Sequence, residues 1–532
     1  MNDTRSSNPF SMMLGLCLAL YAIVSITLTQ GNSISELCLM LMLGGVLLSL
    51  TSPNLAFTFW IISSGYIDLA KRLMVLTGRV NQTDLYYVLG IHPLMLGGIT
   101  ISLLVGAMLG RHRLRNADFG RFIAALLLMA LAAAMSYREK GLQLGGMAAD
   151  VANSGLYAML LFIVPLMVKD LTQTLRVLRL VVISYTPVAI YGIIQQVVGF
   201  QEFEVEYLLT GLSIEIKQLL THEVRAFSTL NSPTALGFAC GACMIFCYII
   251  GWHRDFKTAR LRFSKLIVML MMAAFIGGLF SATMRSAFIL LPVGLLGSWL
   301  FSSRVRIRVF YLTISVSFVL LVVSSKWLLQ LLPQAMTAMY ELSGGSTFLS
   351  QILRVGTYYE RLMGFSNCLA NPAAYTLFGI GGERGRDYAD EFMNHDPLSS
   401  ILIRYGAPAL FLSILAVGLV LRVMHRGVLK LPAGGIRRTA ALLLSVPLGF
   451  MVATVLQGNV FATFPLNLMA YLSLGLIEAL GRSMPQAESQ PAQAHAPMSV
   501  QSQHSGILAR PNALRHPAAG SFATGKRPFT TP

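Results

Sequence analysis

The chain has 532 residues, of which 55% are hydrophobic and only 12% are charged, a balance far outside that of soluble globular proteins. This composition excludes a water-soluble enzyme and predicts a chain that lies in a lipid bilayer. The net charge of +17 does not indicate a nucleic-acid partner, because cationic loops are typical of polytopic membrane proteins and no basic stretch here is interleaved with aromatic residues.

Apolar runs of membrane-spanning length recur along residues 1–481. Since a span needs about 20 apolar residues, we expect an all-α polytopic membrane protein with about 12–14 transmembrane helices and one large outward-facing loop. The predicted spans are residues 10–30, 35–50, 54–70, 88–109, 120–137, 149–168, 177–199, 234–252, 266–282, 286–302, 309–328, 401–421, 439–457 and 461–481. Residue 10 begins a span that lacks a convincing cleavage site, so we expect it to be retained.

The distribution of basic residues predicts the orientation of these spans. Alternate loops carry the basic residues Arg111, Arg113, Arg115, Arg121, Lys169, Arg176 and Arg179, and later Arg254, Lys257, Arg304, Arg306, Arg422, Arg426, Arg437 and Arg438. We place these loops in the cytoplasm and the acidic loops 200–233 and 329–400 outside. Lys71, Arg72 and Arg79 then fall on the outer side, where an interfacial helix would hold them. Residues 482–532 are rich in Ser, Pro, Gln and Ala and are predicted to form a disordered cytoplasmic tail.

The cysteines predict neither a disulfide framework nor a metal site. Cys17, Cys38, Cys240, Cys243 and Cys247 fall in apolar segments, where cysteine behaves as a small buried residue. Three of them share one helical face at positions 240–247, but neither histidine nor a carboxylate lies among them. We therefore expect no structural metal and no cofactor.

Charged residues at the outer ends of apolar spans are the informative ones, because holding an ion there costs free energy unless something compensates. Arg225 precedes the span that begins near residue 234, and Arg285 lies in a short polar turn between two apolar runs. Arg285 alone could be a snorkelling side chain at a helix end. Together with Arg404, however, these residues predict an outward-facing pocket for an anionic ligand. Guanidinium forks suit diphosphate oxygens, because they bind in a bidentate manner and stay charged.

The sequence Asn394-His395-Asp396-Pro397 closes the long outer loop before the span that contains Arg404. Asp396 has the character of an N-cap, followed by proline at the first helical position. His395 would then lie beside the positive end of a helix dipole, which disfavours the imidazolium form. A neutral His395 could accept a proton, although a lone histidine in a loop is more often a hydrogen-bonded structural residue.

Several motifs in this order and topology resemble the O-antigen ligase and O-antigen polymerase superfamily, over roughly residues 185–425. The motifs that carry the resemblance are Tyr191-Gly192-Ile193-Ile194-Gln195-Gln196, Arg225-Ala226-Phe227-Ser228, Asn231-Ser232-Pro233, Ser281 to Ser286, Arg354, Tyr358, Leu377 to Gly382, Asn394-His395 and Tyr405-Gly406. The chain departs from the family in two places. The family often has Asn-Pro-Asn at the third motif, and a Ser-Arg pair where this chain has Met284-Arg285.

The resemblance implies an inverting, metal-independent glycosyltransferase in the bacterial inner membrane, with residues 329–400 as its large periplasmic loop. It implies an undecaprenyl-diphosphate-linked oligosaccharide as donor and a glycan or lipid A core as acceptor. It also implies other polysaccharide-assembly proteins as protein partners. Arg225 and Arg285 would bind the donor diphosphate, and His395 would take the proton of the acceptor hydroxyl. Arg354 and Arg404 would support them.

Two alternatives stay open. A ligase and a polymerase need the same donor pocket and differ in the acceptor; about fourteen spans rather than about twelve favour the polymerase. A lipid-linked oligosaccharide flippase or another polysaccharide transporter would bind the same diphosphate without reacting. Such a transporter is expected to have short loops, whereas the charges here gather beside a long loop.

Overall fold

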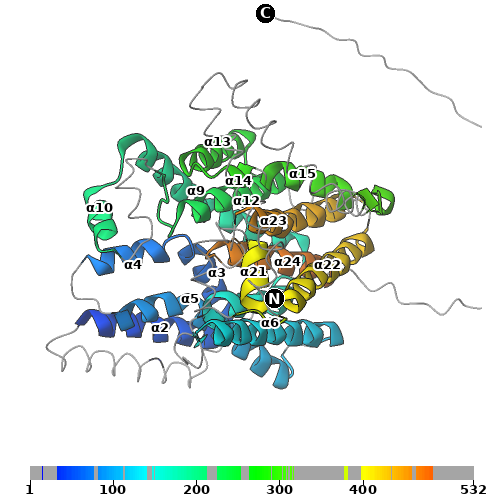
Figure 1. Cartoon of the computed structure of the whole chain (residues 1–532), viewed down its shortest axis with the longest axis horizontal. Coiled ribbons are helices and arrows are strands. Elements are labelled where there is room, and N and C mark those ends of the chain that lie inside the picture. The colour runs from blue at the N-terminus through cyan, green and yellow to red at the C-terminus, as the bar shows by residue number, and fades with distance from the viewer. Residues whose placement is uncertain are drawn as a thin grey trace, which may run out of the picture. The chain divides into compact units, whose positions relative to one another are not determined.

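The computed structural model describes residues 33–76, 82–111, 114–140, 150–211, 225–252, 263–288, 290–301, 377–380, 397–432, 434–457 and 463–482, with a few isolated positions. All secondary structure within these residues is helical, which confirms the predicted all-α class (Figure 1). The predicted spans 10–30 and 309–328 lie almost entirely outside the described residues, as do most of the loop 329–400 and, apart from Arg482, the tail 482–532.

Five helices in the described ranges are long and apolar enough to cross a membrane. These spans are Tyr87–Met108, Asn116–Tyr137, Leu171–Val198, Pro233–Gly251 and Gly435–Thr454. Three shorter apolar helical segments accompany them, at Glu36–Thr51, Val151–Met167 and Lys265–Ser281. Large apolar side chains are exposed on several of these helices, including Ile101 (54%), Leu127 (65%) and Met269 (63%). Such surfaces are what a bilayer would cover.

The predicted continuous span 54–70 is wrong, because the chain breaks it into two helices. Helix α3 (Pro53–Ser63) is followed by a turn and then by the amphipathic helix α4 (Ile67–Val75). The turn is held in the interior, where the Ser64 hydroxyl donates to the Ile61 carbonyl oxygen (2.7 Å) and hydrogen bonds with the Tyr185 hydroxyl (3.0 Å). The sequence predicts an interfacial helix for Lys71, Arg72 and Arg79; α4 carries the first two, and Arg79 lies outside the described residues.

The predicted span 401–421 is interrupted as well. Helix α21 (Pro397–Tyr405) begins at Pro397, as the N-cap pattern predicts, and ends one residue before Gly406. Helix α22 (Ala407–Lys430) follows directly. Gly406 has a φ of +87°, a backbone conformation that favours glycine, so Arg404 lies in the last turn of a short helix rather than inside a long span. Within the predicted span 286–302 the structure describes α14 (Arg285–Phe288) and α15 (Leu290–Phe301), and residue 289 between them lies outside the described residues.

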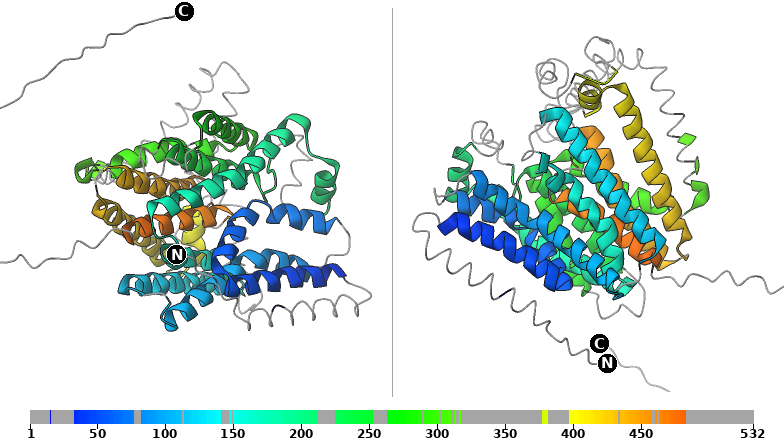
Figure 2. Two further views of the ribbon diagram at one scale, coloured as in Figure 1. Left: turned by 180° about the vertical axis from the view of Figure 1, so that it is seen from behind. Right: turned by 90° about the horizontal axis from the view of Figure 1, so that it is seen from below.

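The remaining helices pack side by side as a bundle (Figure 2). They are α2 (Ser33–Thr51), α5 (Gln82–Met108), α6 (Asn116–Lys140), η1 (Val151–Gly155), η2 (Leu156–Met159), α8 (Leu160–Met167), α9 (Leu171–Val198), α10 (Glu202–Leu209), α12 (Pro233–Trp252), α13 (Lys265–Ser281), α23 (Gly435–Gln457) and α24 (Leu466–Arg482). Helix α2 lies against α5, α9 lies against α12 and α13, and α23 lies against α15 and α24.

The two ends of the bundle differ in charge. We call the end at which α9 finishes and α12 starts the site end, and the opposite end the basic end. The basic end carries cationic residues near the helix termini, namely Lys169, Arg176, Lys265, Arg426, Arg437, Arg438 and Arg482. The site end carries α4 and α10, two short helices outside the apolar spans.

Candidate functional site

The segment 225–232, which leads into α12, forms a compact turn at the site end. The backbone N–H of Leu230 donates to the carbonyl oxygen of Phe227 (3.0 Å). The hydroxyl of Ser232 accepts from the N–H of Ala235 (3.2 Å), and Pro233 is the first residue of α12. Serine before proline at a helix start is a favourable N-terminal arrangement. The motif Asn231-Ser232-Pro233 therefore begins a helix.

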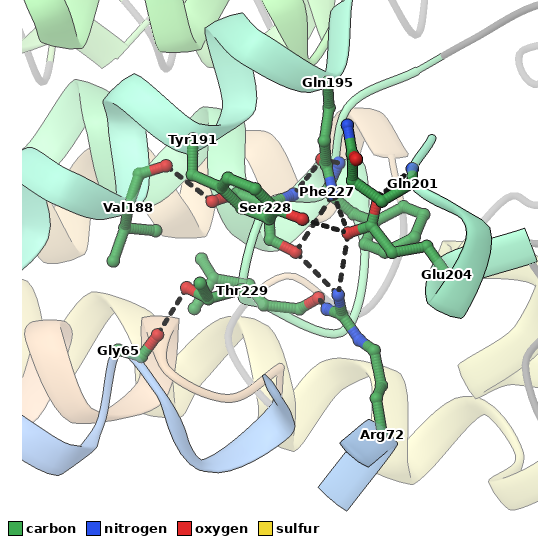
Figure 3. A network of polar contacts seen from close by, with 11 residues as sticks. Gly65, Arg72, Val188, Tyr191, Gln195, Gln201, Glu204, Phe227, Ser228 and Thr229 are labelled. Atoms are coloured by element: carbon green, nitrogen blue, oxygen red, sulfur yellow. Dashed lines mark hydrogen bonds and ion pairs between the residues drawn. The ribbon is translucent and has the colours of Figure 1, made fainter. Parts of the chain in front are cut away.

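Arg72 of α4 binds this turn. The whole residue is only 1% exposed. Its guanidinium donates to the carbonyl oxygen of Ser228 (2.7 Å) and to that of Leu230 (Figure 3). The guanidinium carbon also lies 4.5 Å from the centre of the Phe227 ring, a cation–π contact. A single side chain thus binds three residues of the turn.

Glu204 of α10 provides the opposite charge and is fully buried. Its Oε1 lies 3.8 Å from Nη1 of Arg72, and it accepts hydrogen bonds from the Tyr191 hydroxyl (3.0 Å) and from the Gln195 amide. Its Oε2 accepts from the backbone N–H of Gln201 (3.0 Å). A buried carboxylate is tolerated when its lone pairs are satisfied in this way.

Gln195 of α9 joins the carboxylate to the turn. Its Oε1 accepts from the backbone N–H groups of Phe227 (3.1 Å) and Ser228 (2.6 Å) (Figure 3). The hydroxyl of Ser228 donates to the carbonyl oxygen of Val188 (2.5 Å), and Ser228 has a φ of +56°. A non-glycine residue in this left-handed region is strained, and it persists where surrounding contacts over-determine it. The turn is therefore fixed in one conformation.

Burial lowers the pKa of the Arg72 guanidinium, and the carboxylates of Asp68 and Glu204 oppose this shift. Arginine nevertheless keeps its charge in proteins. Asp68 lies one helical turn before Arg72 and is buried; its Oδ1 is 3.4 Å from Nζ of Lys71. The turn of residues 225–230 is thus held by an ionised network rather than by apolar packing alone.

The second predicted segment, residues 281–285, adjoins this turn. The backbone N–H of Ala226 donates to the carbonyl oxygen of Ser281, the last residue of α13 (3.1 Å). Thr283 has a φ of +50°, and α14 begins at Arg285. The structure therefore brings the residue after Arg225 against the turn that precedes Arg285. Arg225 is half-buried; the side chain of Arg285 lies outside the described residues.

Residues 377–380 of the long loop contact the end of α21. The N–H of Ile380 donates to the carbonyl oxygen of Ile403 (2.8 Å). A Cβ atom at Gly406 would collide with the carbonyl group of Leu377, so only glycine fits there. Arg404 is half-buried beside this contact. Helix α21 and helix α14 both contact α23, but His395, Asp396 and Arg354 lie outside the described residues.

The buried cysteines Cys240, Cys243 and Cys247 lie on α12 as free thiols. Across the part of the chain that the structure describes, no group of three or more His, Cys, Asp or Glu residues is placed to hold a metal ion. The described site is instead built from guanidinium, carboxylate, amide and hydroxyl groups.

Sequence reasoning missed the supporting network. Arg72 was expected on an interfacial helix, not as a buried contact of the turn, and Glu204 was counted only as one acid of an outer loop. The sequence did contain a signal: Arg72 directly follows an apolar run, where a charge costs free energy unless a partner compensates it. The partner itself follows from tertiary packing of α4 against α10, which the spacing of residues does not reveal.

No protein-family model matches the chain, and no curated protein and no solved structure matches it. A rigid turn carrying Arg225 contacts a second turn that leads into Arg285. Arg225 therefore lies on a segment that contacts the turn leading into residue 285, and a guanidinium group suits an anion that presents several oxygens, such as a phosphate or a diphosphate.

Proposed function

We propose that the protein transfers a glycan from an undecaprenyl-diphosphate-linked donor to a sugar hydroxyl at the periplasmic face of the bacterial inner membrane. The product is a polymerised or ligated O-antigen or exopolysaccharide, and polymerisation is preferred over ligation. The observation that carries this proposal is the hydrogen bond from Ala226 to Ser281, which joins the turn of Arg225 to the turn before Arg285.

The rigidity of the Arg225 turn supports a role in catalysis rather than in passive lipid contact. A snorkelling arginine needs no fixed backbone, because its long side chain moves to reach water. Here Arg72, Gln195 and Glu204 fix the backbone on which Arg225 stands. Preorganised charge is most valuable where charge develops during a reaction, since no reorganisation is then needed.

In the proposed reaction, Arg225 and Arg285 bind the donor diphosphate. The bond between the anomeric carbon and the diphosphate oxygen breaks, and the electron pair stays on the diphosphate, whose added charge the two guanidinium groups stabilise. The acceptor oxygen forms the new bond from the opposite face, which inverts the anomeric centre. His395 takes the proton of that hydroxyl.

The test is a transfer assay with the purified full chain and a synthetic undecaprenyl-diphosphate-linked repeat unit, with and without lipid A core. A polymerase yields a ladder of products from the repeat unit alone, and a ligase yields a single conjugate only when lipid A core is present. Movement of the intact donor across a vesicle membrane, without any transfer product, would instead identify a flippase.

His395→Ala sharpens the assay, because this variant should bind the donor but lose transfer by about a hundredfold to ten-thousandfold, the usual contribution of a general base. Donor retention is measured by co-purification of the labelled lipid. Transfer at the wild-type rate in His395→Ala would remove the proposed base and require another proton acceptor.

A further inference from the structure

A cavity of about 440 Å³ lies at the basic end, between α3, the end of α5 and the start of α9. Its walls are partly apolar, with Phe57, Leu103 and Leu166 among the residues that line it. Two cations, Lys169 and Arg176, line it as well, and both are exposed. The cavity therefore combines apolar walls with positive charge at its rim.

The two cations are not neutralised by a nearby described acid. Neither side chain forms an ion pair with a carboxylate in the described ranges, although Asp170 is a sequence neighbour of Lys169. Asp170 does not line the cavity, and its Oδ1 accepts from the N–H of Gln173 (2.6 Å) as the N-cap of α9. The backbone at Lys169 is fixed too, because its N–H donates to Oε1 of Gln173 (2.7 Å).

Apolar surface flanks the cavity on the same helices. Leu55 (59%) and Phe59 (48%) of α3 are exposed, and so are Ile101 (54%) and Val105 (46%) of α5. Exposed apolar side chains on helices of this composition face lipid. The helices that line the cavity therefore also carry exposed apolar side chains.

We propose that this cavity binds one anionic phospholipid. Its phosphate lies between Lys169 and Arg176, and an acyl chain lies along Phe57, Leu103 and Leu166. Basic pockets between transmembrane helices suit the head groups of acidic lipids, since charge attraction adds to the burial of apolar chain. This site lies at the opposite end of the bundle from Arg225, so the inference does not rest on the proposed glycan transfer.

The experiment is native mass spectrometry of the full chain in detergent, titrated with phosphatidylglycerol or with phosphatidylcholine of the same acyl chains. We expect one phosphatidylglycerol molecule to bind per chain. Its affinity should be at least about tenfold higher than that of phosphatidylcholine. The double variant Lys169→Gln/Arg176→Gln should lose that preference. The double variant Lys265→Gln/Arg426→Gln is the matched control, because it removes one exposed Lys and one exposed Arg from the same end, outside the cavity.

A second variant tests whether lipid binding needs the space of the cavity in addition to its positive charge. Thr58 lines the cavity and is exposed, so Thr58→Trp should fill space without disturbing the core. We expect this variant to bind phosphatidylglycerol about tenfold more weakly while its thermal unfolding in lipid-free detergent stays unchanged. Equal loss in both double variants, wild-type binding in Thr58→Trp, or full competition by inorganic phosphate at the same concentration would each overturn the proposal.

Discussion

The two ends of the bundle treat ionised side chains differently. At the site end, Arg72 and Glu204 are almost wholly buried. The Arg72 guanidinium donates hydrogen bonds to backbone carbonyl groups of one turn. At the basic end, Arg121 pairs with Asp118 (2.8 Å) and with Glu478, and Arg482 also pairs with Asp118. The side chains of Arg121, Glu478 and Arg482 there remain 21%, 30% and 19% exposed.

The two sets of charges contribute differently to stability. A buried ion whose partner is removed is left without compensation, which costs about 3–5 kcal/mol, whereas a partly exposed pair contributes about 0–1 kcal/mol. The buried network therefore fixes a backbone conformation, and the exposed cluster ties helix ends together weakly.

The largest effect is expected for Arg72→Met. Methionine fills much of the space but leaves Glu204 and the carbonyl groups of the turn without their cation, so we expect a loss of about 3–5 kcal/mol of stability. Titration of the purified variant with a denaturing detergent measures it. A loss below about 1 kcal/mol in the free energy of unfolding would mean that the contacts of Arg72 do not stabilise the turn.

Arg225→Lys and Arg285→Lys should each reduce glycan transfer by about a hundredfold, because a point charge does not reproduce the guanidinium fork. Stability should change little, since the printed contacts of Arg72 and Gln195 with the turn stay in place in both variants. The transfer assay and the detergent titration are run on the same preparations, with Arg121→Lys as control. Wild-type turnover in both variants would favour the snorkelling interpretation.

Glu204→Gln gives an intermediate effect. The amide still accepts from Tyr191, but the negative charge opposite Arg72 is gone, so we expect a loss of about 2 kcal/mol. If the Glu204 charge acts only by fixing the turn of residues 225–230, Glu204→Gln should lower the transfer rate and leave the affinity for the acceptor unchanged. A variant as stable as the wild type would show that hydrogen bonding alone suffices.

The smallest effect is expected for Arg121→Met at the basic end. Asp118 keeps Arg482 as a partner, and Arg121 is partly exposed, so we expect a loss of about 1 kcal/mol or less. The same detergent titration measures it. A loss as large as that of Arg72→Met would erase the difference between the two ends.

The helical class and the approximate positions of several spans follow from sequence, because long apolar runs have few other solutions in a bilayer. The breaks at Gly65 and Gly406 were missed. Glycine alone is a weak signal within an apolar run, and distant partners contact both turns: Tyr185 bonds to Ser64 at the first, and Ile380 donates to Ile403 beside the second.

The candidate site was predictable only in part. Order along the chain indicated that Arg225 and Arg285 belong to one end, and the contact between Ala226 and Ser281 agrees with that. The buried support from Arg72 and Glu204 was not predictable, since its geometry depends on how α4 and α10 fold over the end of α9. The roles of His395 and Arg354 stay predictions.

An experimental structure of the full chain with undecaprenyl diphosphate bound would test directly whether Arg225 and Arg285 bind the donor diphosphate. We expect the diphosphate to lie at the site end, with the guanidinium groups of both Arg225 and Arg285 in contact with its oxygens and the contacts between Arg72 and Glu204 intact. A diphosphate bound elsewhere, or two arginines too far apart for one diphosphate to bridge, would contradict it.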